Sequence, residues 1–353
     1  MSFPFLQPYF GLGSGLQTKN AAGGGGGGIG GWVELARTTL GSVGDTITVS
    51  SLSNKRYYMI LSSQLNSGAI YSRLTMNNDT GSSYAFRRNI DNGGDANGIS
   101  QSSIADITNT ATYPYLFVGY VSNYSTKEKL VQILSVGQNT AGAANAPTRT
   151  ENVAKWTNIS NAINRFDLNN TGSGDFDTNS EVVVLGWDPA DTHSNNFWTE
   201  LASTTLTGSA DTINSGTFTA KKYLWVQAAF ISSGGACEPM LTFNGDTGAN
   251  YTYRRSVNGS ESTGTSQTSL QSYGGSNIGF LNYFFVNVST KEKLGMLHLV
   301  STGTGVGASN VPDRRELALK WTNTSNQITS LSFANVGVGH FGIGSTVKVW
   351  GSN

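Results

Sequence analysis

The chain has 353 residues, including 44 glycines and one cysteine, and its 22 basic residues balance its 22 acidic residues. A net charge near zero argues against a nucleic-acid-binding protein that relies on a basic surface. Only 12% of the residues are charged, about half of the usual quarter, and Gly, Ser, Thr and Asn supply most of the polarity. This composition favours a β-rich protein with many turns over an α/β enzyme.

Neither a disulfide nor a membrane span is expected. Cys237 is the single cysteine, so it has no intrachain partner, and we expect it to be a small buried apolar residue. No apolar run approaches the roughly 18 residues of a transmembrane helix. The first ten residues lack the basic leader of a secretory signal.

The first element, residues 1–31, is an apolar arm followed by a glycine-rich leash that includes six consecutive glycines at positions 23–28. An apolar arm left free in solution would promote aggregation. We therefore expect it to dock in a groove on a partner, with folding back onto its own domain as the alternative. The side chains expected to make this contact are Phe3, Phe5, Leu6, Tyr9, Phe10, Leu12 and Leu16.

The rest of the chain is an internal duplication, with an offset of 164 to 167 residues between matched segments. Such self-similarity indicates a tandem repeat of a whole domain. We assign residues 32–187 to the first copy, 188–197 to a short polar linker and 198–353 to the second copy. The clearest matches pair WVELARTTL at 32–40 with WTELASTTL at 198–206, STKEKL at 125–130 with the same letters at 289–294, and KWTN at 155–158 with KWTN at 320–323.

Short apolar runs, separated by Gly, Asn, Asp and Ser, predict about eight strands in each copy. No segment has a helical period over more than a turn or two. The predicted fold is all-β, with two tandem homologous β-sandwich, jelly-roll-like domains preceded by an extended N-terminal arm. The clearest predicted strands are residues 57–61, 115–121, 129–134, 181–185, 223–229 and 347–350.

Two Asp-Thr-Gly tripeptides, at Asp79 and Asp246, are the sharpest catalytic candidates, because two-lobed aspartic proteases use a pair of such aspartates that share one proton. Asn77-Asn78 and Asn244-Gly245 precede them, which is typical of a tight turn. The arginine pairs that follow would favour two ionised carboxylates. We therefore expect surface turns and a chain that is not an enzyme.

Other candidate sites are weaker. Oxygen-rich loops at 91–95 and 175–177 could bind calcium, but plain turns are more common there, so we expect no cofactor. His193, His298 and His340 lie too far apart in sequence for metal or triad spacing. Eight Asn-x-Ser/Thr sequons matter only in a glycosylating compartment.

Aromatic and arginine residues recur in both copies. Tryptophans repeat as Trp32 with Trp198, Trp156 with Trp321 and Trp187 with Trp350, which favours packing over a sugar-binding platform; Trp225 is expected in the core. Exposed rings on loops would instead favour sugar binding. The residues expected to contact a neighbouring subunit are Arg87, Arg88, Arg254 and Arg255.

The arm, the leash and the repeated WxELAxTTL and STKEKL blocks resemble structural proteins of tailed or archaeal viruses of the marine type. The repeated blocks cover residues 32–350, and the resemblance implies a virion location, as capsid decoration, capsid shell or tail appendage. We expect a non-enzymatic capsid decoration, cement or surface protein, held by its arm in a homo-oligomer or on the major capsid protein. A receptor- or glycan-binding tail or adhesin module is the alternative, and a double jelly-roll major capsid protein a more distant one.

Overall fold

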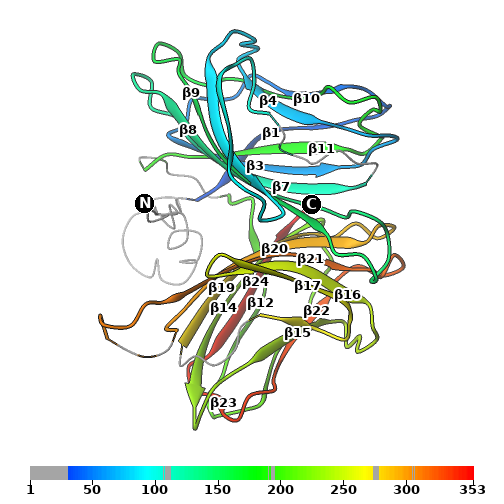
Figure 1. The fold of residues 1–353 in the computed structure, drawn as a ribbon, viewed down its shortest axis with the longest axis vertical. Helices are drawn as coiled ribbons and strands as arrows, with labels where there is room; N and C mark the ends of the chain where they lie inside the picture. Colours follow the sequence, from blue (N-terminus) through cyan, green and yellow to red (C-terminus); the bar gives the residue numbers. More distant parts are fainter. Residues whose placement is uncertain are drawn as a thin grey trace.

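The computed structural model describes residues 31–105, 107, 113–189, 191, 195–272, 278–303, 305 and 307–353. Within these residues every helix or strand element is a β-strand, which confirms the all-β prediction (Figure 1). All six of the clearest predicted strands are present. The arm residues at positions 3–16 lie outside the described residues. The described part of the chain has no helix long and apolar enough to cross a membrane.

Strands from the first copy form two antiparallel sheets with a shared core. The large sheet has the order β1-β11-β3-β7-β8-β9-β5-β6 and the small sheet the order β2-β10-β4. The bounds are β1 (Val33–Thr39), β2 (Thr46–Val49), β3 (Tyr57–Gln64), β4 (Ser72–Met76), β5 (Tyr84–Ile90), β6 (Ala96–Gln101), β7 (Tyr115–Ser122), β8 (Lys129–Gly137), β9 (Thr148–Trp156), β10 (Phe166–Asn170) and β11 (Glu181–Trp187).

Strands from the second copy repeat this arrangement. The large sheet runs β12-β24-β14-β19-β20-β21-β16-β17, with β23 paired to β14, and the small sheet runs β13-β22-β15-β18. The bounds are β12 (Thr199–Thr205), β13 (Thr212–Thr217), β14 (Tyr223–Ser233), β15 (Pro239–Phe243), β16 (Tyr251–Val257), β17 (Ser260–Gln267), β18 (Leu270–Gln271), β19 (Ile278–Val286), β20 (Lys293–Ser301), β21 (Asp313–Trp321), β22 (Ser330–Asn335), β23 (His340–Phe341) and β24 (Thr346–Ser352).

Irregularities in the ladders also repeat. The first strand of each large sheet has a register shift, between Glu34 and Ala36 in β1 and between Glu200 and Ala202 in β12. β-Bulges of this kind are specific local features that bend and twist a strand. Their presence at matching places shows that the similarity between the copies extends to backbone detail.

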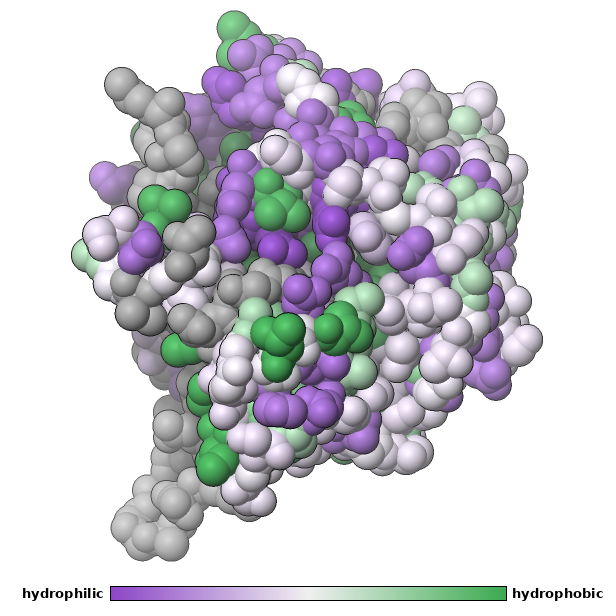
Figure 2. Space-filling model, turned by 60° about the horizontal axis from the view of Figure 1, so that its bottom comes forward, coloured by the Kyte–Doolittle hydropathy of each residue, from purple (hydrophilic) through white to green (hydrophobic). Residues whose placement is uncertain are grey.

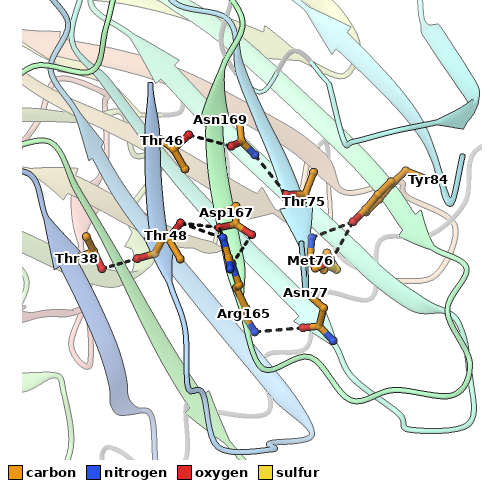
Figure 3. Close-up of polar contacts among 10 residues, drawn as sticks. All are labelled: Thr38, Thr46, Thr48, Thr75, Met76, Asn77, Tyr84, Arg165, Asp167 and Asn169. Carbon is orange, nitrogen blue, oxygen red and sulfur yellow. Dashed lines mark hydrogen bonds and ion pairs between the residues drawn. The ribbon is translucent and has the colours of Figure 1, made fainter. Parts of the chain in front are cut away.

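The small sheet of the first copy alternates between an apolar inner face and a polar outer face. Phe166 and Leu168 of β10 lie in the core, whereas Asp167 and Asn169, which alternate with them, bond to polar neighbours (Figure 3). Asp167 accepts hydrogen bonds from the Thr48 hydroxyl at 2.6 Å and from Arg165 Nε at 2.8 Å. The period-2 pattern of a half-buried strand therefore accounts for this sheet.

The two large sheets pack against each other, so that the small sheets lie outside and the molecule has four layers (Figure 1). A single buried apolar cluster joins them and draws side chains from both copies, which we call the inter-sandwich core. Because both faces of each large sheet are covered here, central strands such as β11 are buried along nearly their whole length. The members are Trp32, Met59, Leu61, Leu116, Val118, Val136, Val183, Leu185, Phe197, Trp198, Tyr223, Trp225, Phe284, Val286, Leu294, Met296, Ala318 and Trp350.

Polar contacts surround the inter-sandwich core. The Tyr223 hydroxyl donates to Glu181 Oε1 at 3.0 Å, and Lys222 lies 3.1 Å from the same carboxylate. On another side, the fully buried Lys320 donates to the backbone carbonyls of Gln138 and Thr140 at 3.0 and 2.7 Å. A buried charge needs such partners to offset its lost hydration. These contacts fix the two copies in one relative orientation.

Glu316 in β21 is the most strongly perturbed carboxyl of this junction. Burial, and then repulsion from Glu151, raise its pKa to about 7, although Arg314 and Arg149 lie 2.9 and 3.7 Å away. His298 faces it in the register of β20, and burial lowers the pKa of that imidazole to about 4. Four charged or titratable groups therefore surround a carboxyl that is poorly solvated.

The raised pKa of Glu316 predicts a pH-dependent cost to folding. Its carboxyl is protonated in the folded protein below about pH 7 but ionises near 4.5 when unfolded, so its ionisation destabilises the fold as the pH rises between these values. The free energy of unfolding of Glu316→Gln should therefore rise relative to that of wild type as the pH increases. From pH 5 to pH 8 this relative gain should be on the order of 2 kcal/mol. Urea unfolding at both pH values measures this. The same difference in unfolding free energy between the two proteins at pH 5 and pH 8 would contradict the raised pKa of Glu316.

Candidate functional site

The two Asp-Thr-Gly segments form matching turns. In each copy the turn lies where the chain passes from the small sheet to the large one. Asn77 and Asn78 both have positive φ, and the amide of Asp79 donates to the carbonyl of Met76 at 3.0 Å, which defines a type I′ turn. Asn244, Gly245 and Asp246 repeat this geometry. The turn composition in the sequence is therefore realised in both copies.

Each aspartate is bound by a tryptophan from the repeated KWTN block. Trp156 Nε1 donates to Asp79 Oδ2 at 2.7 Å, and Trp321 Nε1 donates to Asp246 Oδ2 at 2.7 Å. Burial alone would raise the pKa of each carboxyl, but the bonds from the indole and from a turn glycine outweigh it and lower the pKa. Each ionised carboxylate thus serves its own turn, which is not the geometry of two aspartates that share one proton.

The repeated STKEKL block supplies the third member of this arrangement. Lys129 is fully buried, donates to the carbonyls of Lys127 and Asn158 at 3.0 and 2.8 Å, and lies 5.7 Å from the centre of the Trp156 ring. Lys293 makes the equivalent bonds in the second copy, 5.8 Å from the Trp321 ring. Three of the repeated blocks therefore meet in a Lys–Trp–Asp unit that joins loops within each sandwich.

Most aromatic rings singled out in the sequence are buried. Six tryptophans are less than 9% exposed. Trp187 is half-buried and stacks on Tyr57, with ring centres 5.3 Å apart. A sugar-binding platform requires an exposed ring face, and none of the six buried tryptophans offers one. The six buried residues are Trp32, Trp156, Trp198, Trp225, Trp321 and Trp350.

The four arginines predicted as subunit contacts occupy different environments. Arg87 is exposed and lies 3.4 Å from Asp95. Arg88 is half-buried, and burial lowers its pKa. Arg254 reaches across the junction, where its Nε donates to the Pro147 carbonyl at 3.0 Å. Its contact is therefore with the other half of the same chain.

Arg255 lines the candidate site, an open cavity of about 380 Å³ at the corner of the second sandwich. Its guanidinium donates from Nε to Ser262 Oγ and from Nη1 to Gln271 Oε1, both at 2.8 Å, and lies 5.2 Å from the centre of the Tyr253 ring. These contacts hold the planar group in one orientation. The full lining is Arg255, Val257, Ser260, Glu261, Ser262, Gln271 and Arg315.

A second arginine gives the cavity a positive balance. Arg315 of β21 pairs with Val257, two residues beyond Arg255 in β16, so both arginines project from the same face of the sheet. The one acidic lining residue, Glu261, already pairs with Arg254. Two neighbouring guanidinium groups suit a carboxylate, sulfate or phosphate, which they bind through paired hydrogen bonds.

The first copy lacks this pair. Arg88 occupies the place of Arg255, but Thr150 occupies the place of Arg315, as the matching registers Ile90–Thr150 and Val257–Arg315 show. Sequence reasoning found Arg255 and missed Arg315 and Gln271. A residue-by-residue comparison of the two copies would have marked Arg315 as a charge gained in one copy only.

The remaining sequence candidates have structural partners or lie elsewhere. The sequon residues Asn123 and Asn287 are buried and accept the amides of Ile163 and Ile328 at 3.1 and 2.7 Å, so the folded chain does not present them for glycosylation. Cys237 is fully buried, as expected. His193 lies outside the described residues.

Metal-binding candidates find no support in the described ranges. There, no group of three or more His, Cys, Asp or Glu side chains is placed to hold a metal ion. In the candidate calcium loop at 91–95, Asp91 Oδ1 instead accepts the amide of Arg149 at 2.7 Å and pairs with Arg254 at 3.1 Å.

No protein-family model matches the chain, and no curated protein matches it. Among solved structures, domains LG4-5 of the mouse laminin alpha1 chain are 10% identical, with 95% of this chain and 92% of that chain covered and a TM-score of 0.19. A pair of C2 domains from extended synaptotagmin 2 is 7% identical, with 78% and 94% covered and a TM-score of 0.10. Scores this low do not bear on function.

The Lys–Trp–Asp unit predicts a measurable coupling between Trp321 and Asp246. Trp321→Phe removes the indole donor, and the lost bond to a half-exposed carboxylate should cost on the order of 1 kcal/mol. Since Asp246 has a lowered pKa, this contribution is present above its ordinary value of 3.8 and is lost as the pH falls below it. A double-mutant cycle with Asp246→Asn, measured by urea unfolding at pH 7 and pH 3, tests this. Additive effects at pH 7 would show that the contact contributes nothing.

Proposed function

We propose that this chain is a non-enzymatic structural protein of a virus particle, attached through its N-terminal arm to neighbouring subunits or to the major capsid protein. The observation that carries the proposal is that the residues of the repeated blocks are in structural contacts. Trp32 and Trp198 pack in the inter-sandwich core, and the other blocks build the Lys–Trp–Asp units. The features that recur in both copies stabilise the fold, as expected of a structural subunit.

The inter-sandwich core supports the same role. Two sandwiches fused through an apolar junction form one block whose ends keep a fixed separation, which suits a subunit on a repeating surface. Both faces of each large sheet are largely covered, which keeps their apolar side chains away from water. These properties favour a capsid decoration or cement protein. A double jelly-roll major capsid protein is less favoured, because the two halves of such proteins rarely remain as similar in sequence as the two copies here.

The arm supplies the attachment in this proposal. Its seven apolar side chains, at positions 3–16, would each contribute about 1.5–3 kcal/mol when buried, and ordering each arm residue would cost about 1–2 kcal/mol. The net attachment per copy is therefore modest. A lattice or homo-oligomer with many identical sites converts a modest term into stable attachment.

Removal of residues 1–28 tests the attachment. We expect the truncated chain to keep its β-rich circular dichroism spectrum and thermal unfolding, because the described sheets begin at Val33, but to lose self-association and particle binding. Light scattering of the full and truncated chains, alongside a particle-binding assay, measures both. Unchanged assembly of a folded truncated chain would reject the arm as the anchor.

A receptor- or glycan-binding module is the second candidate function, and the Arg255–Arg315 cavity favours it. Burial of the tryptophans argues against recognition by ring stacking, so this candidate rests on charge. The ligand class would be a sugar that carries a carboxylate or sulfate, held by the two guanidinium groups.

Substitution of the cavity arginines separates this candidate from the structural one. With sialyllactose and a sulfated disaccharide as probes, Arg315→Thr, which installs the residue of the first copy, should lower affinity by at least about tenfold. Arg88→Gln in the first copy is the matched control and should leave affinity unchanged. Titration calorimetry measures both, and equal, weak binding by all three proteins would reject the cavity as a glycan site.

A further inference from the structure

One loop at the outer end of each sandwich has the same backbone in both copies. It follows the pattern Asn-x-Gly-x-Gly-x-Phe, at residues 170–176 and 335–341. Asn170 Oδ1 accepts the amide of Gly172 at 2.8 Å and its Nδ2 donates to the Gly174 carbonyl. Asn335 makes the same two bonds with Gly337 and Gly339.

The glycines of this loop are required by close packing. A Cβ added at Gly172 would collide with the backbone carbonyl of Ala69, and one added at Gly337 would collide with that of Ala236. The asparagine and the glycines therefore set the loop conformation in both copies. The residues between them have no such role in either copy.

Those intervening residues differ in character. The first copy has Thr171 and Ser173, whereas the second has Val336 and Val338. Just beyond the loop, Ile343 replaces Thr178, and the next residue has a positive φ in both copies. Since the same loop forms with hydroxyl side chains, its conformation does not require the apolar ones.

The apolar residues are also strongly exposed. Val336, Val338 and Ile343 are 63%, 88% and 65% exposed, and Ile231 beside them is 39% exposed. Ile231 contacts this segment, because its carbonyl accepts the amide of Gly342 at 2.6 Å. Figure 2 turns this end of the molecule forward and shows apolar side chains standing among polar ones. We call Ile231, Val336, Val338 and Ile343 the valine patch.

We propose that the valine patch binds the N-terminal arm of a neighbouring copy of this chain. The inference deepens the proposed function and rests on it, since that function assigns the arm to a neighbour. An exposed group of branched apolar side chains that the fold does not need is a recognised mark of an interaction surface. The corresponding end of the first sandwich carries Val43 and Tyr71 as its exposed apolar residues, so the patch distinguishes the two ends.

The arm has the composition and the reach for this site. It carries seven large apolar side chains within residues 3–16, which can bury the exposed side chains of the valine patch. The described chain begins at Gly31, beside Asn196 at the junction of the two copies. The 15 residues from Leu16 to Gly31 can span at most roughly 50 Å. The arm can therefore extend well away from the junction and toward another copy.

Each molecule would then offer one arm and one valine patch. Contacts between molecules would run head to tail and build rings or open chains. Two full-length variants separate the components. The patch variant carries Val336→Thr, Val338→Ser and Ile343→Thr, which are the residues of the first copy. The arm variant carries Phe5→Ser and Phe10→Ser. Ile99→Thr, at a residue 75% exposed in β6, is the control for loss of an exposed apolar residue elsewhere.

Light scattering across a concentration series gives the result. Wild type and the Ile99 control should associate, and each of the two other variants alone should associate at least about tenfold more weakly. An equimolar mixture of the two variants should form dimers, because the intact arm of one meets the intact patch of the other. Thermal unfolding of both variants with the same midpoint temperature as wild type confirms that they are folded.

Other outcomes separate the two proposals. If the arm variant loses association but the patch variant keeps it, the arm binds elsewhere, so the valine patch is rejected and the proposed anchoring stands. If the arm variant still associates, the arm is not needed for self-association, for example because valine patches bind each other. Both proposals, the arm as the anchor and the valine patch as its binding site, are then rejected for this chain. A wild type that stays monomeric at all concentrations rejects the patch as a site for a neighbour's arm, while binding of the arm to another capsid protein is tested by the particle assay.

Discussion

The apolar contact between the two large sheets is the constraint on which the rest of the molecule depends. It covers the second face of each large sheet, so the central strands carry apolar residues at consecutive positions rather than in alternation. It also directs the small sheets outward and fixes the separation of the two sandwich ends. A single copy separated from the other would expose Leu61, Val183 and Leu185 to water, so the duplicated pair is the stable unit rather than the single repeat.

The sequence predicts much of this fold because its evidence is local or self-referential. The duplication is visible by comparison of the chain with itself, and runs such as residues 57–61 and 347–350 fall within β3 and β24. Packing of the two large sheets could not be predicted in the same way. A continuous apolar run indicates that both faces of a strand are covered, but it does not say what covers the second face. Arg254 illustrates this, since its partner Pro147 belongs to the other half of the same chain.

The candidate site is less predictable, because its residues come from strands of two sheets that meet only in the folded sandwich. Arg255 and Arg315 are brought together by the antiparallel register of β16 and β21. Gln271 lies on β18 of the small sheet and reaches Arg255 only because the two sheets pack together. Lys129 shows the opposite difficulty. In sequence it belongs to a charged STKEKL block that resembles a solvated turn, yet it is fully buried under Trp156 because backbone carbonyls receive its ammonium group.

The Asn-x-Gly-x-Gly-x-Phe loop has a consequence for how such a chain can change. Its conformation depends on one asparagine amide, two glycines and a buried phenylalanine, so substitutions at the intervening positions should have little effect on folding. The duplication provides two of these loops on one scaffold, and mutation can therefore alter the chemistry of one end while the other end keeps its own. Two ends of different surface chemistry thus share one loop conformation in this chain.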